Sequence, residues 1–222
     1  MLHIEIFVCN PFSEQCYVVW DENSRLAFVV DPGMAGDYEW ERVHRYIEQN
    51  QLQMQFILQT HGHSDHCMGS AYLARTYNIH IYGSMDEQNR MPSVQTQNNV
   101  FGIEAPLQWL PIDRNLNDGD VLWLGEESSE DSHRIEVYDC PGHSFHGLCF
   151  YLPQDRILFS GDVLFCGSVG RSDFGPMMGG NGPLLIKSIV EKLMSLPTDV
   201  RVYPGHGPMT TIGYEATYNP YF

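Results

Sequence analysis

The amino-acid sequence predicts a mixed α/β (α+β) fold in which two β-sheets pack face to face and helices cover their outer sides. Three features lead to this prediction. Short strand patterns occur in both halves of the chain, helix patterns lie between them, and no linker separates the halves. Sheets that bury one face and helices that bury one stripe are stable as stacked layers around a core. We therefore expect one domain over residues 1–222.

The first half begins with three strand patterns, which we expect to form a meander. They cover residues 3–8, 16–21 and 26–31, and the last leads into the turn sequence DPG. Apolar residues at helical spacing then predict a helix over 37–50 with Asp37 as its N-cap. This half is completed by a buried strand over 54–59, a helix over 70–77 and a strand over 80–83.

The second half returns to strand patterns after a weakly patterned segment. Residues 84–111 are polar and rich in Gln and Asn, so we expect a mixture of helix and loop there. Four strands are predicted over 120–125, 134–140, 147–153 and 156–162. They are followed by a Gly- and Met-rich loop over 166–183, an amphipathic helix over 184–197 and a last strand over 200–205.

The composition limits the classes of partner. Lys and Arg number 12 against 28 Asp and Glu, and the resulting formal charge of −16 repels nucleic acids and anionic membranes. Four of the acids fall in GEESSED (125–131), which we expect to be a solvated loop. No apolar run approaches the roughly 18 residues of a membrane span, and the N-terminus lacks signal-peptide features. We therefore expect a cytoplasmic protein that acts on a small molecule; the sequence does not indicate its oligomeric state.

The six cysteines form no CxxC pair and lie mostly inside apolar runs. We expect them to be free, largely buried thiols in a reducing compartment. Cys67 directly follows His66, and we expect it to pack in the core as well.

The sequence THGHSDH (60–66) places three histidines and an aspartate directly behind the apolar run QFILQ. Zinc sites on helices use His residues at i and i+4, whereas His61 and His63 are two residues apart and Asp65 and His66 are adjacent. This spacing indicates a loop that leaves a strand, with one pair turned to each side. Such a division suits two metal ions close together better than one.

Three more ligand-type residues stand at the ends of later strands. They are His143 in CPGHS, Asp162 in FSGD and His206 in YPGHG, each at a turn that contains Gly. A single His after Pro-Gly is more often an ordinary turn residue, because turns favour Pro and Gly. Seven donors in the same strand-end setting favour a metal site instead, since so many converging polar groups would be unfavourable without a partner.

These motifs resemble those of the metallo-β-lactamase fold hydrolases, and within them the glyoxalase II-like branch. The resemblance runs from NPFSEQCYVVWD and VVDPG through THGHSDH, PGHS, SGDVLF and GRSDF to PGHG and the closing TTIGYEATYNPYF. It implies a four-layer αββα sandwich with the metals at one edge. It also implies that His61, His63 and His143 hold one ion, that Asp65, His66 and His206 hold the second, and that Asp162 bridges both.

Two metal ions at this site would account for hydrolysis without a Ser or Cys nucleophile. A water shared by two cations about 3.5 to 4 Å apart loses its proton near neutral pH, while a metal polarises the attacked carbonyl. Asp65 and Asp162 are the expected catalytic carboxylates, Asp65 because it would also orient or deprotonate that water. Zinc is the expected metal, with iron and manganese as alternatives.

The substrate is expected to be a thioester or a related small ester. Glyoxalase II proper carries a C-terminal extension with basic residues for glutathione, whereas this chain ends 16 residues after His206. Three alternatives stay open: a mononuclear iron persulfide dioxygenase that would use His61, His143 and Asp162, a lactonase or phosphodiesterase of the same fold, and a non-catalytic binding module.

Several other residues have less specific expectations. Arg171 in GRSDF is a candidate for binding a substrate carboxylate, with a local ion pair to Asp173 as the alternative. The loop over 175–183 is expected either to cover the site or to be a surface insertion. His146 either lines the pocket or lies outside it, and the remaining histidines are expected to be structural or exposed: His3, His44, His80 and His133.

Overall fold

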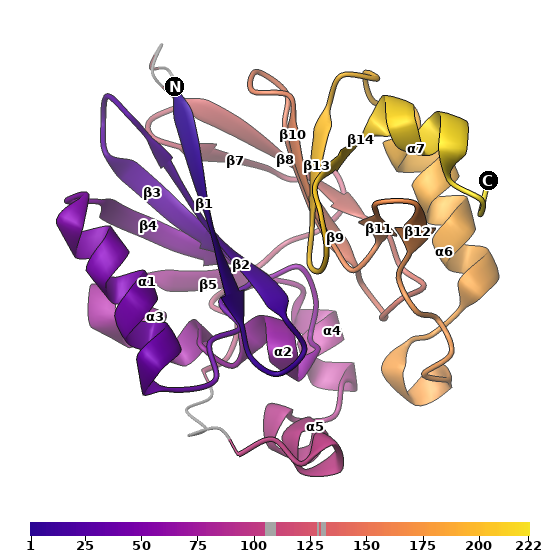
Figure 1. Cartoon of the computed structure of the whole chain (residues 1–222), viewed down its shortest axis with the longest axis horizontal. Helices are drawn as coiled ribbons and strands as arrows, with labels where there is room; N and C mark the ends of the chain where they lie inside the picture. Colours follow the sequence, from indigo (N-terminus) through magenta and orange to yellow (C-terminus); the bar gives the residue numbers. More distant parts are fainter. Residues whose placement is uncertain (105–109, 128, 130–131) are drawn as a thin grey trace.

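The computed structural model describes residues 1–104, 110–127, 129 and 132–222. Two six-stranded sheets face each other, and helices lie on the outer side of each sheet (Figure 1). The expected four-layer αββα sandwich is therefore confirmed. No helix in these residues is long and apolar enough to cross a bilayer.

The first sheet has the strand order β1-β2-β3-β4-β5-β6. Its first three strands form the expected antiparallel meander, and the next three are added in parallel. In the parallel pair β3–β4, Val30 lies opposite Leu58, so the residues that follow these strands meet at one edge. The strands are β1 (Leu2–Cys9), β2 (Glu14–Asp21), β3 (Leu26–Val30), β4 (Gln53–Leu58), β5 (His80–Gly83) and β6 (Arg114–Asn115).

The second sheet has the order β14-β13-β10-β9-β8-β7. In its one parallel pair, β10–β13, Gly161 lies opposite Pro204, so Asp162 and His206 leave the sheet at the same edge. The strands are β7 (Val121–Leu124), β8 (His133–Asp139), β9 (Leu148–Leu152), β10 (Ile157–Gly161), β13 (Arg201–Pro204) and β14 (Thr210–Thr211). A small hairpin of β11 (Leu164–Phe165) and β12 (Ser168–Val169) follows β10.

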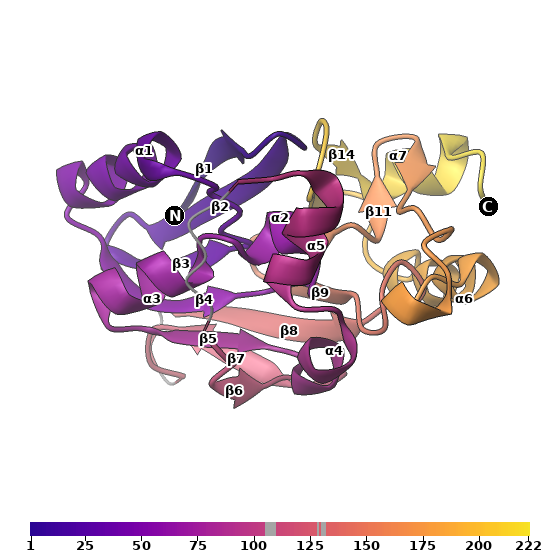
Figure 2. The same cartoon turned by 90° about the horizontal axis from the view of Figure 1, so that it is seen from below.

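The helices divide between the two outer faces and the edge that carries the strand ends. Figure 1 shows α1 (Asp37–Gln49) and α3 (Ser70–Tyr77) on the first sheet, and α6 (Gly182–Ser188) and α7 (Ile212–Tyr218) beside the second. A π-helical turn, η2 (Ile189–Leu193), continues α6. Three short helices lie in the lower part of the molecule in Figure 1 and are seen from below in Figure 2: α2 (Ser64–Cys67), α4 (Met85–Arg90) and α5 (Val94–Phe101). A 3₁₀ turn, η1 (Pro176–Met178), lies in the loop before α6.

Alternating side chains build the layers. On β2, Tyr17 and Val19 point into the core between the sheets, whereas Cys16 and Val18 point to the layer under α1 and α3. The inter-sheet core is closed by large side chains such as Phe28, which is fully buried. Burying an aromatic or branched side chain contributes about 1.5–3 kcal/mol to the stability of the fold. This core therefore fixes the position of one sheet's strand ends relative to those of the other.

Helix termini account for most differences from the sequence predictions. The N-cap of α1 is Gly36, and Asp37 is its first helical residue, so the prediction of an Asp37 cap is wrong. The Glu39 carboxylate instead accepts from the Asn10 and Ala35 amides in front of the helix. The helix predicted over 184–197 begins two residues earlier, because the Asn181 side chain caps it by accepting from the Leu184 amide.

The weakly patterned segment 84–111 contains two short helices. Ser84 and Ser93 cap α4 and α5 by accepting from backbone amides three residues ahead. Residues 105–109 lie outside the described residues. So do Ser128, Glu130 and Asp131 of the predicted acidic loop.

Candidate metal centre

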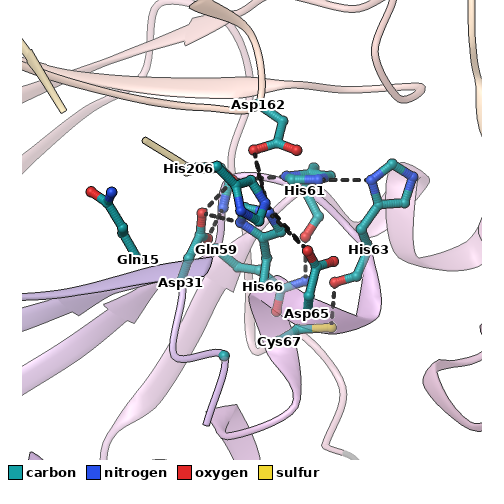
Figure 3. A network of polar contacts seen from close by, with 12 residues as sticks. Gln15, Asp31, Gln59, His61, His63, Asp65, His66, Cys67, Asp162 and His206 are labelled. Atoms are coloured by element: carbon teal, nitrogen blue, oxygen red, sulfur yellow. Dashed lines mark hydrogen bonds and ion pairs between the residues drawn. The ribbon is translucent and has the colours of Figure 1, made fainter. Parts of the chain in front are cut away.

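All seven predicted donors lie at the edge where the strands of both sheets end. His61 and His63 follow β4, and Asp65 and His66 lie on α2, so the predicted loop turns helical at Ser64. His143, Asp162 and His206 follow β8, β10 and β13. Figure 3 shows Asp162 reaching from one side toward the four donors of the THGHSDH segment on the other. The two sheets therefore contribute donors to one cluster.

Three imidazoles form the first donor group. His63 Nδ1 lies 2.9 Å from His61 Nε2 and 2.9 Å from His143 Nε2. All three side chains are buried. Burial lowers the pKa of each ring, that of His63 to about 3, because the surroundings disfavour a charged imidazolium. The three rings are therefore neutral and present lone pairs to one another.

Asp65, His66 and His206 form the second donor group. Asp65 Oδ2 lies 3.3 Å from His206 Nε2 and 3.7 Å from His66 Nε2. Asp162 lies between the groups, with Oδ1 3.4 Å from His66 Nε2 and Oδ2 3.5 Å from His143 Nε2. One carboxylate oxygen thus faces each group, as a bridging ligand requires.

The donor atoms fit metal ions better than they fit one another. His66 Nε2 and Asp162 Oδ1 are buried but have no hydrogen-bond partner. Unsatisfied buried polar atoms are unfavourable, so a partner is expected there. Donors of a tetrahedral zinc site, with bonds of about 2.0–2.1 Å, lie roughly 3.3 Å apart, close to the spacing of the second group. The set of histidine nitrogens and carboxylate oxygens also matches the ligand preference of zinc and of iron.

Hydrogen bonds behind the donors set which nitrogen of each ring faces the cluster. His66 Nδ1 lies 3.0 Å from Asp31 Oδ2 and donates to it, which leaves Nε2 free. The Thr60 hydroxyl donates to the same carboxylate at 2.6 Å and accepts from His61 Nδ1 at 2.9 Å. His143 Nδ1 donates to the Arg171 main-chain oxygen at 2.7 Å. These three rings therefore aim Nε2 lone pairs at the cluster.

The two carboxylates of the second group set its electrostatics. Burial alone would lower the pKa of His66, but Asp162 and Asp65 more than offset it, and the pKa is raised well above its ordinary value. Burial would raise the pKa of Asp162, and the facing histidines lower it instead. The second group therefore carries negative charge that protons neutralise when no cation is bound, so protons and metal compete for it.

Two side chains that the sequence did not single out hold the THGHSDH segment. Gln97 of α5 accepts from the Ser64 amide at 3.0 Å and donates to the Gly62 oxygen at 2.9 Å. Glu87 of α4 accepts from the Gly62 amide at 3.1 Å. The serine caps of α4 and α5 were a signal for these helices, but the sequence contains no motif for main-chain contacts of this kind.

The loop that carries His206 packs against the cluster without space for side chains. A Cβ on Gly205 would lie 2.5 Å from His66 Cε1 and closer still to Asp162 Oδ1. Gln15 of β2 fixes this loop, because its amide donates to the Gly205 oxygen at 2.8 Å and its side chain donates to the Gly207 oxygen. Glycine at 205 therefore allows the His206 loop to approach the donors.

A cleft of about 290 Å³ opens onto the cluster. Arg171 lines it and forms the ion pair to Asp173 that was the alternative to substrate binding, with Nε 2.9 Å from Asp173 Oδ1 and a second nitrogen 3.0 Å from Oδ2. Met178, from the loop over 175–183, reaches the cleft. The full lining is Phe12, His63, Asp65, Gln97, Phe101, His143, Asp162, Phe165, Arg171, Phe174, Met178 and His206.

His146, His133 and Cys67 do not belong to the donor groups. His146 does not line the cleft; its ring nitrogens lie 2.9 Å from Asp139 and 2.9 Å from Asp86. His133 lies between Asp155 at 2.8 Å and Asp21 at 3.2 Å, a structural role. Cys67 Sγ donates to the His63 oxygen at 3.1 Å, and burial raises the pKa of its thiol, so it does not supply a thiolate.

Comparisons with known proteins give one consistent family. The model of the Metallo-beta-lactamase superfamily matches residues 9–206. The chain is 34% identical to the hydroxyacylglutathione hydrolase GloC of Haemophilus influenzae, over 99% of this chain and 98% of that protein. The crystal structure of BLEG-1 B3 metallo-beta-lactamase superposes with a TM-score of 0.86 and 30% identity, covering 99% of both chains. The crystal structure of TTHA1623 in a di-iron-bound form superposes with a TM-score of 0.82 and 32% identity, covering 98% of this chain and 100% of the other.

Proposed function

The chain belongs to the metallo-beta-lactamase superfamily, and from this premise we propose that it hydrolyses a thioester at a centre of two divalent metal ions. In this proposal His61, His63 and His143 hold one ion, and Asp65, His66 and His206 hold the other. The observation that carries the proposal is the position of Asp162, whose two carboxylate oxygens lie 3.4 Å and 3.5 Å from donors of different groups.

The chemistry divides between the ions and the protein. When bound, two divalent ions supply a Lewis acid for the carbonyl oxygen and lower the pKa of water so that it is a nucleophile near neutral pH. Burial would raise the pKa of Asp65, but His66 and His206 lower it, so the carboxylate is ionised at neutral pH and can orient water by accepting a hydrogen bond from it. Phe174 places an apolar ring 5.2 Å from that of His63, on the wall of the cleft.

The metal and the substrate are the finer parts of the proposal. We propose zinc, and iron is the alternative that the di-iron form of TTHA1623 supports. The thioester is supported by the similarity to a hydroxyacylglutathione hydrolase over nearly the whole chain. A mononuclear persulfide dioxygenase would use His61, His143 and Asp162, and it gives no reason for the second group of donors.

Metal analysis and one substitution test the proposal. Protein purified without added metal should contain two zinc or mixed ions per chain and should cleave acyl thioesters in preference to lactones and phosphodiesters. Asp162→Ala should lose metal and abolish hydrolysis while the protein stays folded by circular dichroism. Glu191→Gln, an exposed carboxylate on η2, is the control. A single Fe(II) with thiol-dependent oxygen uptake, or unchanged turnover of Asp162→Ala, would refute the proposal.

A further inference from the structure

Aromatic side chains form most of the cleft wall that is not a metal donor. Phe12, from the turn between β1 and β2, meets Phe101 of α5 edge to face, with ring centroids 5.3 Å apart. Their side chains are 40% and 50% exposed, although aromatic rings normally gain from burial. Exposed apolar side chains that gather at a cleft mark a binding surface. The mouth of the cleft therefore offers apolar contacts to a ligand.

The apolar wall continues to the donors themselves. The Phe174 ring lies 5.2 Å from His63 and 5.7 Å from His143, and Phe165 lies 6.3 Å from His206. Both donor groups thus have a phenylalanine beside them. A substrate whose carbonyl reaches the donors must place the adjoining groups against these rings.

Cations are almost absent from the same wall. All 12 Lys and Arg side chains belong to the described part of the chain, and Arg171 is the one that lines the cleft. Its guanidinium is already bound by both oxygens of Asp173 and lies 4.8 Å over the Phe174 ring. The formal charge of −16 further repels anions. A ligand carboxylate placed at the mouth of the cleft, away from the metal donors, would lose water without gaining a free cationic side chain as partner.

We propose that the cleft selects thioesters in which neither the acyl group nor the thiol carries a charge, with an apolar group packed against the exposed faces of Phe12 and Phe101. This inference rests on the proposed thioester hydrolysis and specifies its substrate class. It predicts that anionic thiols such as glutathione, with two carboxylates, are poorer leaving groups for this protein than neutral thiols that carry the same acyl group.

Two matched pairs of ligands test the selection, one by rate and one by binding. The kcat/KM for hexanoyl-N-acetylcysteamine should be about tenfold higher than the kcat/KM for hexanoylglutathione. It should also be at least tenfold higher than the kcat/KM for acetyl-N-acetylcysteamine. The corresponding thioethers, S-hexyl-N-acetylcysteamine and S-hexylglutathione, cannot be hydrolysed. Calorimetry should show that the neutral thioether binds more tightly to the protein as purified.

Variants at the mouth of the cleft identify the residues responsible. Phe12→Ala and Phe101→Ala should reduce the preference for hexanoyl over acetyl thioesters by about tenfold. Both side chains are partly exposed, so folding should persist. Phe101→Arg should raise kcat/KM for the glutathione thioester relative to the neutral one. Val100→Ala is the matched control, because Val100 is 76% exposed on the same helix and does not line the cleft.

The outcomes separate this inference from the proposed function. If glutathione derivatives are cleaved or bound as well as their neutral counterparts, or if acyl length and the Phe variants have no effect, the selection is wrong while thioester hydrolysis stands. If no thioester is cleaved but the neutral thioether still binds more tightly and Phe101→Ala weakens it, the proposed reaction is wrong and the apolar selection is supported.

Discussion

Asp31 Oδ2 lies 3.0 Å from His66 Nδ1, and both side chains are almost completely buried. Asp31 adopts φ 46°, in the left-handed region that is rare for residues other than glycine. Strain of this kind persists where the surroundings enforce it, and here the same carboxylate also accepts from the Thr60 amide and hydroxyl. Asp31 thereby fixes the orientation of two neighbouring donors, His61 through Thr60 and His66 directly.

Replacing Asp31 by the isosteric Asn should weaken metal binding without unfolding the protein. The amide nitrogen would donate toward His66 Nδ1, so the ring would carry its proton on Nε2 and could not present a lone pair. We expect metal affinity to fall about 10–100-fold, as measured by competition with a chromophoric chelator. Unchanged affinity would show that Asp31 does not set the His66 tautomer.

Gln97→Leu should loosen the segment that carries the donors. The substitution leaves the buried Ser64 amide without its acceptor, which costs about 1–3 kcal/mol of stability. We expect a lower midpoint in urea and weaker metal binding. Gln97→Glu keeps an acceptor for the Ser64 amide, so its urea midpoint and metal affinity should both be closer to those of the wild type. Gln95→Leu, an exposed position on the same helix, should leave the midpoint and the metal affinity unchanged.

Gly205→Ala should disrupt the second donor group by steric overlap. The new Cβ would lie 2.5 Å from His66 Cε1, a distance that backbone and ring must relieve by moving apart. Overpacking of this kind costs about 1–3 kcal/mol, and we expect the protein to bind one ion instead of two. Gly36→Ala, where a Cβ meets nothing within 4 Å, is the control. Full occupancy of both sites in Gly205→Ala would contradict the packing argument.

His146 should make stability depend on pH in the alkaline range. Its hydrogen bond to Asp139, together with that to Asp86, raises its pKa to about 9, above the ordinary value of about 6.5 in unfolded chains. The contribution is therefore complete below pH 6.5 and is lost as the pH rises through about 9. Because the side chain is 29% exposed, we expect only about 1 kcal/mol.

The matched measurement compares urea unfolding of wild type and His146→Gln, each at pH 6 and pH 9.5. The difference between the two proteins should be largest at pH 6 and should nearly vanish at pH 9.5. His80→Gln, whose side chain is 70% exposed, should show a much smaller difference at either pH. A difference that grows toward high pH would have the wrong sign for a raised histidine pKa.

The sequence is most informative where strand ends determine side-chain positions. The strand patterns place Asp162 and His206 at strand ends, and the parallel pairing of β10 with β13, which the patterns do not show, brings both residues to one edge. Asp31 also follows a strand, but DPG indicates only a turn, and nothing in that pattern predicts its bond to His66. Gln97 gives no signal, because an amide that contacts the main chain of a distant loop leaves no pattern in the sequence.

Helix ends and the cleft wall depend on tertiary packing. Asp37 fits the statistics of an N-cap, but Glu39 satisfies the amides ahead of α1 from inside the helix. Phe12 and Phe101 are far apart in the sequence, and Phe101 lies in a segment without clear periodicity. Their contact follows from the position of α5 beside α2, which the composition of residues 84–111 does not indicate.

Arg171 separates two tasks within one residue. Its main-chain oxygen accepts from His143 Nδ1, whereas its side chain faces the cleft and Asp173. Any residue that keeps the backbone conformation preserves the main-chain contact to His143. The side chain at position 171 can therefore change without disturbing the orientation of the His143 ring. A different side chain at position 171 would therefore change the wall of the cleft while the main chain keeps the orientation of His143.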